Sequence, residues 1–360
     1  MAIFTDVFED VTKQGRKLPT NMYLDEGLFP IIDQGQNQVA GYTNETEGVF
    51  VDVPVIIFGD HTRVIKYVDT PFFLGADGVK VLKAKSKSVN YKYLYYALCS
   101  ANIPNTGYNR HFKWLKEVEI PDLPENEQAD IVSQLENIDC LISLHHQQLA
   151  KLDELVKSRF IELFGDPISN PKGWKVNKVE NHIDLLSGFP FDSSQYTESG
   201  INICGGLIIM PQRIEWNDCK HWRSVEGYEE YALKENDIVI ALDRPWISEG
   251  FKIAVVDAEH LPALLIQRTA RIRAIGINQM YLLYCFLLGG FDKHCNVTGS
   301  LVPHISAKDI RSFAIMLPPV EIQEQFATFV EQTDKSKLAI QESLAKLEML
   351  KKSLMQQYFG

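Results

Sequence analysis

Apolar residues alternate in steps of four and three along residues 125–165, which is the spacing of a coiled-coil seam. The seam positions are Ile131, Leu135, Ile138, Ile142, His145, Leu149, Leu152 and Val156. Pro124 precedes this run, where its missing N–H costs nothing, and two glutamates in the first turn suit the positive end of a helix dipole. The pattern predicts a helix of about 40 residues, roughly 60 Å long. Its apolar stripe needs a partner of similar length.

The same pattern returns 195 positions later without a gap. The corresponding residues are Pro124 and Pro319, Gln128 and Gln323, Ile131 and Phe326, Leu135 and Val330, Leu149 and Leu344, Leu152 and Leu347, and the pairs Phe164-Gly165 and Phe359-Gly360. Two helices at equivalent ends of two repeats most simply bury their stripes against each other. An ordinary pair of dimerisation helices is the alternative, but it leaves the duplication unexplained.

Short β-branched runs between turn residues predict strands in the two regions outside these helices. The predicted strands are residues 29–32, 54–58, 64–68, 79–82 and 118–120 in the first region, and 201–203, 237–240, 252–256 and 270–273 in the second. Short helices are expected at 91–99 and 279–288. The two regions also repeat weakly, because residues 55–61 resemble 238–244, and Thr106-Gly107 resembles Thr298-Gly299.

The predicted fold class is α/β (α+β), with two globular domains separated by two long antiparallel coiled-coil helices in a pseudo-twofold internal repeat. The expected boundaries are 1–121 for the first globular domain, 122–165 for the first long helix, 166–317 for the second globular domain and 318–360 for the second long helix.

Composition is that of an ordinary globular protein, with 45% hydrophobic and 23% charged residues. No apolar run reaches the ~18 residues of a membrane span, and the N-terminus lacks the pattern of a signal peptide. The six cysteines form no Cys-x-x-Cys pair, so neither a zinc ribbon nor a disulfide framework is indicated. These features predict a cytoplasmic protein with reduced thiols.

The net charge of -11 argues at first against a nucleic-acid partner. Most of the excess acid lies in residues 119–165, which carry 3 basic and 10 acidic residues. The remaining regions are near neutral, and a near-neutral domain can still present one basic face. Much of the affinity for phosphate would then have to come from partner proteins.

Several kinds of catalytic motif are absent from the sequence. It contains no phosphate-binding Gly-x-x-x-x-Gly-Lys-Ser/Thr loop and no Asn-Pro-Pro-Tyr-like tetrapeptide of an amino-methyltransferase. The triplet Asp218-Cys219-Lys220 has no convincing upstream acid for a restriction-type nuclease. His145 and His146 are adjacent, so they point to different helix faces and cannot hold one metal together. We predict no catalytic residue and no metal site, and we expect His145 to set the register of the seam.

Polar and basic clusters at corresponding places in both globular regions indicate DNA recognition. Amide side chains can pair with adenine, and lysine and arginine can contact phosphate or guanine. The predicted DNA contacts are Gln34, Gln36, Asn37, His61, Lys80, Tyr108, Asn109, Arg110 and His111 in the first region, and Arg244, Trp246, Gln267, Arg268, Arg271 and Arg273 in the second. For each residue alone, a solvated surface loop is the alternative interpretation.

A proline entry, a glutamine in the first helical turn, a long leucine seam and a Phe-Gly end occur twice in the chain. The residues that carry them are Ile120-Pro121-Asp122-Leu123-Pro124 with Gln128, Leu317-Pro318-Pro319 with Gln323, Phe164-Gly165-Asp166-Pro167 with Pro171-Lys172-Gly173-Trp174, and Tyr358-Phe359-Gly360. In this combination the chain resembles specificity subunits of type I restriction-modification systems over essentially its whole length.

The resemblance implies a non-catalytic subunit whose two target-recognition domains each read one half of a bipartite sequence in double-stranded DNA, while the helices act as a spacer. It also implies two modification subunits, which methylate adenine with S-adenosylmethionine, and restriction subunits, which use ATP and Mg. The chain itself is expected to bind no cofactor and no membrane. The alternatives are an enzyme with its own methyltransferase or nuclease chemistry, and a coiled-coil adaptor or scaffold protein without DNA binding.

Overall fold

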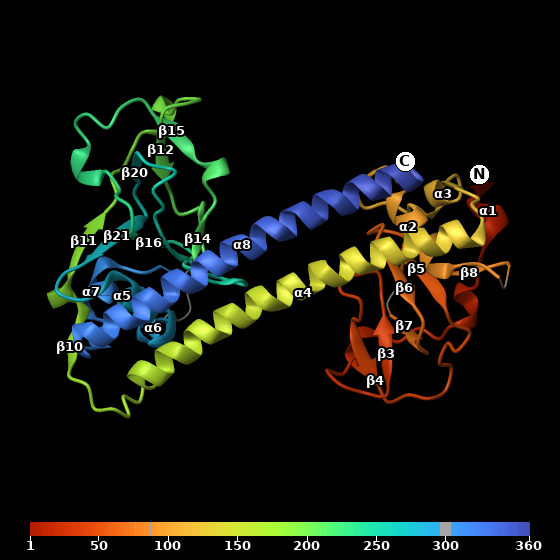
Figure 1. The fold of residues 1–360 in the computed structure, drawn as a ribbon, viewed down its shortest axis with the longest axis horizontal. Coiled ribbons are helices and arrows are strands. Elements are labelled where there is room, and N and C mark those ends of the chain that lie inside the picture. Colours follow the sequence, from red (N-terminus) through yellow and green to blue (C-terminus); the bar gives the residue numbers. More distant parts are fainter. Residues whose placement is uncertain (76, 87, 296–303) are drawn as a thin grey trace. The chain divides into compact units, whose positions relative to one another are not determined.

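The computed structural model describes residues 1–75, 77–86, 88–295 and 304–360. The chain divides into two compact units, of which unit 1 comprises Met1–Gln147 with Ile340–Gly360 and unit 2 comprises Gln148–Ala339. Two 40-residue helices, α4 (Glu125–Phe164) and α8 (Val320–Phe359), each contribute to both units (Figure 1). The prediction of two long helices in a mixed α and β fold is confirmed. Within the described residues, no helix is both long and apolar enough to cross a membrane.

The described part of unit 1 contains a four-stranded, a three-stranded and a two-stranded sheet, with three short α-helices besides the long ones. The four-stranded antiparallel sheet has the order β2 (Phe8–Asp10), β8 (Val79–Ala84), β5 (Val55–Gly59) and β6 (Ile65–Val68). In the second sheet, β3 (Phe29–Ile32) pairs antiparallel with β4 (Gly41–Thr43) and parallel with β7 (Phe73–Leu74). The remaining elements are β1 (Ala2–Ile3) paired with β9 (Glu119–Ile120), and helices α1 (Phe4–Val7), α2 (Tyr91–Ser100) and α3 (Phe112–Leu115).

Unit 2 repeats this topology. Its four-stranded sheet has the order β11 (Ile183–Ser187), β21 (Thr269–Ala274), β16 (Ile238–Ala241) and β19 (Ile253–Val255). In its second sheet, β12 (Ile201–Cys204) pairs antiparallel with β15 (Lys220–Trp222) and parallel with β20 (Ala263–Leu265). The other elements are β10 (Val176–Lys178) paired with β22 (Ala314–Met316), the hairpins β13 (Ile209–Met210) with β14 (Arg213–Ile214) and β17 (Trp246–Ile247) with β18 (Gly250–Phe251), and helices α5 (Gln279–Leu288), α6 (Phe291–His294) and α7 (Ala307–Ser312).

The internal repeat predicted for the globular regions is therefore present, with a correction of one residue in its alignment. Ile56 pairs with Leu82 across the sheet of unit 1, and Ile238 pairs with Ile272 across the sheet of unit 2. Leu82 and Ile272 occupy the same position in β8 and β21, because each lies two residues before the alanine that pairs with the first residue of β2 or β11. Ile56 thus corresponds to Ile238, whereas the sequence comparison matched Val55 with Ile238. The other proposed match, Thr298-Gly299, lies outside the described residues.

The two long helices pair antiparallel, because residue numbers rise along α4 as those of their partners on α8 fall. The cross-helix contacts join Gln134 to Tyr358, Asp139 to Lys351 and His145 to Ser343 in unit 1, and Asp153 to Lys337 in unit 2. The His145 Nε2 atom lies 2.9 Å from the Ser343 hydroxyl, so this seam histidine makes a polar contact across the pair. Such a contact favours one register, since a shifted pairing would leave it unmade.

Both long helices complete the core of each unit. In unit 2, Phe160 and Phe164 of α4 pack on Tyr281 of α5 and Phe326 of α8, with ring centroids 4.7 to 5.8 Å apart. In unit 1, buried residues of α4 join the core of the four-stranded sheet and α2, and the last turns of α8 pack against them. Each apolar stripe is therefore buried at both ends, which stabilises a helix far more than its intrinsic propensity does.

The glutamine in the first turn of each long helix fastens that helix to the segment before it. Gln128 Nε2 donates to the carbonyl of Leu123, and Gln323 Nε2 donates to the carbonyl of Pro318, both at 2.8 Å. Gln323 is buried, and its side-chain oxygen also accepts the backbone N–H of Asn278 at the start of α5. This repeated contact explains why glutamine occupies the same position in both repeats.

A buried tyrosine makes the second repeated contact at these junctions. The Tyr93 hydroxyl of α2 donates to the carbonyl of Pro121, and the Tyr281 hydroxyl of α5 donates to the carbonyl of Met316, both at 2.9 Å. Burial raises the pKa of Tyr93 to about 12 and that of Tyr281 further, so both hydroxyls keep their protons and remain donors.

The end of α4 is set by Gly165. Its φ of +81° is a left-handed conformation that glycine adopts without strain, and its N–H donates to the carbonyl of Ile161 at 2.7 Å. The Trp174 indole N–H donates to the carbonyl of Phe164, which would otherwise lack a helical partner. These contacts explain why a tryptophan follows the Phe-Gly end of α4, since its indole N–H satisfies the last helical carbonyl.

We expect Gln323→Leu to lower the free energy of unfolding of unit 2 by about 1–3 kcal/mol, because it leaves two backbone groups without their partner. Urea unfolding followed by far-UV circular dichroism measures this loss, because the helices and strands that it detects lie in both units. Gln128→Leu is the matched control. Gln128 is only half-buried and makes one such contact, so its loss should be smaller. An equal or larger loss in Gln128→Leu would contradict this account of the junctions.

Candidate nucleic-acid interface

Three loops of unit 1 meet beyond the ends of β3 and β5. They follow β3, follow β5 and precede α3. Gln34 joins the first two, because its side-chain oxygen accepts the His61 N–H at 3.2 Å and its backbone carbonyl accepts the Thr62 hydroxyl at 2.6 Å. Its Nε2 donates to the carbonyl of Asp77 at 3.0 Å. The side-chain oxygen and nitrogen of Gln34, a predicted DNA contact, are thus both used in internal hydrogen bonds that hold the loops together.

The third loop is fixed by His61 and His111. The rings of His61 and Tyr108 stack with centroids 4.7 Å apart, and His61 Nδ1 donates to the carbonyl of Asn109 at 3.2 Å. His111 is fully buried, and both its backbone N–H and its Nδ1 point to the carbonyl of Asp60, at 2.8 and 3.0 Å. His111 therefore anchors the loop from inside, although the sequence had suggested an exposed donor.

The predicted DNA contacts of unit 1 fall into an exposed set and an internally paired set. The exposed residues are Gln36, Asn37, Tyr108, Asn109 and Arg110, although Tyr108 also stacks on His61 and the Asn109 amide also donates to the carbonyl of Thr106. Arg110 lies close enough to Asp77 that, after the larger effect of Lys17, it helps to lower the pKa of that carboxyl. Lys80 is half-buried, pairs with Asp10 at 3.0 Å and lies over the Phe112 ring, so its charge already has partners.

Buried lysines support the first of these loops in both units, and sequence reasoning did not single them out. Lys66 of β6 donates to the carbonyl of Asn37 at 2.6 Å and lies 3.4 Å from Asp33. Lys252, just before β19, donates to the carbonyl of Gly206 in the loop after β12. Burial lowers the pKa of each lysine. A lysine within an otherwise apolar strand was the available signal, because such a residue must find a polar partner inside.

Unit 2 brings Arg268 and His304 together around Asp243, which Arg244 follows in the chain. Arg268 Nη1 lies 3.0 Å from Asp243 Oδ2, and His304 Nδ1 lies 2.5 Å from Asp243 Oδ1. The segment before α7 is tied to the end of β16 by the Ile305 N–H, which donates to the carbonyl of Leu242 at 2.8 Å. This tie matches the one between His111 and Asp60 in unit 1.

Gln267 and Arg268 remain accessible, and the Arg268 side chain is 75% exposed despite its ion pair. Arg244 is exposed too, with a left-handed φ of +45°, and Arg268 has a φ of +66°. Positive φ at a non-glycine residue costs about 1–3 kcal/mol and is typical of functional loops. These three side chains are the exposed part of the predicted basic cluster.

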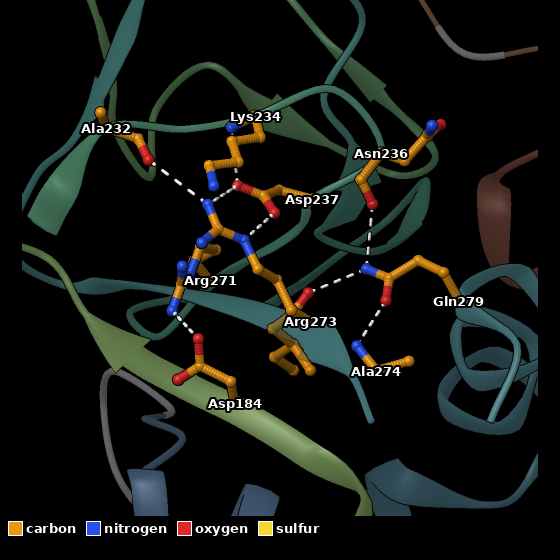
Figure 2. A network of polar contacts seen from close by, with 10 residues as sticks. Asp184, Ala232, Lys234, Asn236, Asp237, Arg271, Arg273, Ala274 and Gln279 are labelled. Atoms are coloured by element: carbon orange, nitrogen blue, oxygen red, sulfur yellow. Dashed lines mark hydrogen bonds and ion pairs between the residues drawn. The ribbon is translucent and has the colours of Figure 1, made fainter. Parts of the chain in front are cut away.

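Arg271 and Arg273 are held by acidic partners inside unit 2 (Figure 2). Arg271 is buried and bonds to Asp184 at 2.5 Å, while Arg273 makes two bonds to the buried Asp237, at 2.5 and 2.8 Å. Asp237 raises the pKa of Arg273. Arg271 thus pairs with an exposed carboxylate of β11, and Arg273 pairs with a buried carboxylate just before β16, so both arginines have acidic partners within unit 2.

Trp246 also has an internal role. Its ring stacks on Phe251 across the β17–β18 hairpin, with centroids 5.0 Å apart, and packs on the core of unit 2.

Within the described ranges, no group of three or more His, Cys, Asp or Glu side chains is arranged to hold a metal ion.

Comparison with known proteins agrees with this two-part organisation. The model of the type I restriction modification DNA specificity domain matches residues 4–154 and 171–349. The EcoAI specificity subunit of the type I restriction enzyme of Escherichia coli is 28% identical over 224 residues, which are 59% of this chain and 36% of that protein. The chain thus aligns with little more than a third of that relative's length.

Two further similarities extend over more of the chain. The MjaVIII specificity subunit of a type I restriction enzyme of Methanocaldococcus jannaschii is 26% identical over 313 residues, 79% of this chain and 74% of the relative. The crystal structure of the S subunit of a type I restriction-modification system from M. genitalium superposes with a TM-score of 0.61 at 17% identity, covering 100% of this chain and 95% of that one. With the family model matching most of its length in two successive segments, this chain belongs to the family of type I restriction-modification DNA specificity subunits.

Proposed function

We propose that this chain reads a bipartite, asymmetric sequence in double-stranded DNA, with residues 1–121 and 166–317 as its two target-recognition domains. The observation that carries the proposal is one sheet topology used twice with different exposed loops. In unit 1 these loops expose amides, an aromatic ring and Arg110, whereas in unit 2 they expose two arginines and the amide of Gln267. Equal scaffolds with unlike loops should read unlike half-sites.

The side chains of each exposed set suit different base edges. Gln36, Asn37 and Asn109 carry amides, which can donate to and accept from adenine in the major groove. Arg244 and Arg268 carry guanidinium groups, which suit the two acceptors of guanine. Asp243 would hold the Arg268 guanidinium in one orientation before DNA arrives, which lowers the entropy lost on binding.

In this proposal, the helices over residues 122–165 and 318–360 fix the spacing between the half-sites and carry two modification subunits. These subunits would bind S-adenosylmethionine and methylate adenine, and restriction subunits with ATP and Mg would complete the assembly. The chain would contribute no catalytic residue of its own and would act in the cytoplasm. The antiparallel pairing of the two helices supports the role of a spacer, because each helix runs through both units.

We expect Arg268→Ala to relax specificity within one half-site and Arg110→Ala to do so within the other. Each change should cost about 1–3 kcal/mol of specific binding if the arginine contacts a base. Equilibrium binding of the intact complex at fixed salt, together with methylation mapping by long-read sequencing, measures both effects. Lys234→Ala is the control, because Lys234 is exposed and lies at the opposite end of β16 from Arg244. Unchanged methylation at every site in Arg268→Ala would reject a contact role for that arginine.

The spacer role predicts the outcome of an insertion in both long helices. Four helix-forming residues placed between Gln147 and Gln148 and between Glu342 and Ser343 lengthen each helix by roughly 6 Å. Because one base-pair step is about 3.4 Å, the gap should grow by one or two base pairs while both half-sites stay the same. Methylation mapping measures the gap. The same insertion in α4 alone misaligns the seam and should abolish methylation instead. A changed half-site or an unchanged gap after the double insertion would refute the spacer role.

The proposal that this chain binds no cofactor of its own is tested by titrating S-adenosylmethionine into the isolated protein. We expect no heat of binding from the isolated chain and stoichiometric binding from its complex with modification subunits. Binding to the isolated chain would favour an enzyme that carries its own methyltransferase chemistry.

A further inference from the structure

We propose that Leu207 is a base-reading residue of unit 2, and that it contacts the C5-methyl group of a thymine in the major groove. Apolar side chains discriminate thymine in this way, because the methyl group is the one apolar feature that a base presents in that groove. The inference deepens the proposed function and rests on it.

The exposure of Leu207 first draws attention to it. Leu207 is 89% exposed, and among the large hydrophobic side chains of the described residues the next most exposed is Tyr108 at 87%. These two residues lie on loops of different units, and each loop adjoins candidate DNA contacts. A single exposed leucine is ordinary in a soluble protein. Its position, and the rigidity of the loop that carries it, make this one unusual.

The backbone around Leu207 is firmly held. The N–H groups of Ile208 and Ile209 donate to the carbonyl of Gly205 at 3.1 and 3.3 Å, and both isoleucine side chains are buried. From beneath, the buried Lys252 donates to the carbonyl of Gly206. The chain is thus pinned on both sides of Leu207 while the leucine side chain remains outside. An apolar group presented in this way loses little conformational entropy when it binds.

The loop of Leu207 also adjoins the candidate arginines. A Cβ atom added to Gly206 would lie 3.7 Å from the carbonyl oxygen of Arg268 and 3.6 Å from the Cβ of Ala241, the last residue of β16. Arg268 and the segment that leads to Arg244 are therefore neighbours of this loop. An apolar reader beside guanidinium groups would suit a half-site in which thymine lies near guanine.

The corresponding loop of unit 1 supports the assignment by contrast. It follows β3 as the Leu207 loop follows β12, and it too is held by a buried lysine, since Lys66 donates to the carbonyl of Asn37. Its exposed side chains are the amides of Gln36, Asn37 and Gln38, of which Gln38 donates to the carbonyl of Tyr67. The two units therefore present opposite chemistry from the same supported position, as expected where each loop helps to choose a different base.

Replacing thymine by deoxyuridine tests the contact directly, because uracil keeps the base pair and lacks only the methyl group. Target duplexes, with the sequence taken from methylation mapping, would carry this replacement at one thymine at a time in the half-site that Arg268→Ala alters. We expect one replacement to weaken binding of the intact complex about fourfold at fixed salt, as burial of one methyl group predicts. The Leu207→Ala complex should bind the thymine and uracil duplexes with equal affinity.

Ile275→Ala is the matched control. Ile275 is an exposed apolar residue of the same unit, but it follows β21 whereas Arg268 precedes that strand. This variant should keep the sensitivity to uracil. Substitution of either exposed side chain removes no buried contact, so both proteins should fold.

The remaining outcomes separate this inference from the proposed function. If the wild-type complex selects its target over a scrambled duplex but tolerates every uracil, the contact is absent and the proposed function stands. If the Leu207→Ala complex binds the uracil duplex more weakly than the wild-type complex does, the leucine contributes affinity without a thymine methyl group. The side chain then acts as a wedge between base steps, and the proposed contact is overturned. If the wild-type complex does not distinguish target from scrambled duplex at any salt concentration, the proposed function itself fails.

Discussion

Neither unit of this chain closes its core without an end of both long helices. An amphipathic helix of 40 residues is stable in water only where its apolar stripe is covered. Here α4 and α8 cover each other, and their ends insert phenylalanine, isoleucine and leucine side chains into the two globular cores. The glutamine and tyrosine contacts at each junction then fix the helix start relative to the sheet. The helices therefore pair, and the globular cores form, through the same set of buried contacts.

The polar side chains of the candidate interface fall into two groups: those that hold the loops in place and those that remain exposed. The side chains of Gln34, His61 and His111 form hydrogen bonds with neighbouring loops. The buried Lys66 and Lys252 donate to backbone carbonyls of the loops after β3 and β12. Because this support is internal, the exposed side chains can differ between units without disturbing the sheet. The same scaffold can thus present mostly amides in one unit, and arginines with a leucine and one amide in the other.

Sequence periodicity was sufficient for the long helices, since a seam of eight positions in steps of four and three has few other solutions. The helix α5 was predicted with its observed bounds, and most central strands to within a residue or two. Several strands were missed, among them β2, β4, β7, β10 and β15, and the reason is clearest for β11 and β20. The first has only weak alternation, and the second is a short stretch, Ala263–Leu265, that is buried throughout. Neither leaves a period-two pattern for the sequence to display.

The candidate interface could be predicted only in part, for a different reason. Arg268 and Arg271 look alike in sequence, but one lies before β21 and the other within it. Their exposure depends on acidic partners far along the chain, since Asp184 is 87 positions away from Arg271. Leu207 gave no signal at all, because an apolar residue after a strand normally predicts burial. Such assignments require the strand pairing, which short-range patterns do not specify.

The packing of α8 against unit 1 has a consequence for biosynthesis. Phe359, near the C-terminal end of the helix, lies with its ring 5.3 Å from that of Tyr93 in the core of unit 1. A ribosome releases all of residues 148–339, which form unit 2, before it releases residues 340–360. The core of unit 1 can therefore close only after all of unit 2 has been translated, although most of unit 1 is translated first.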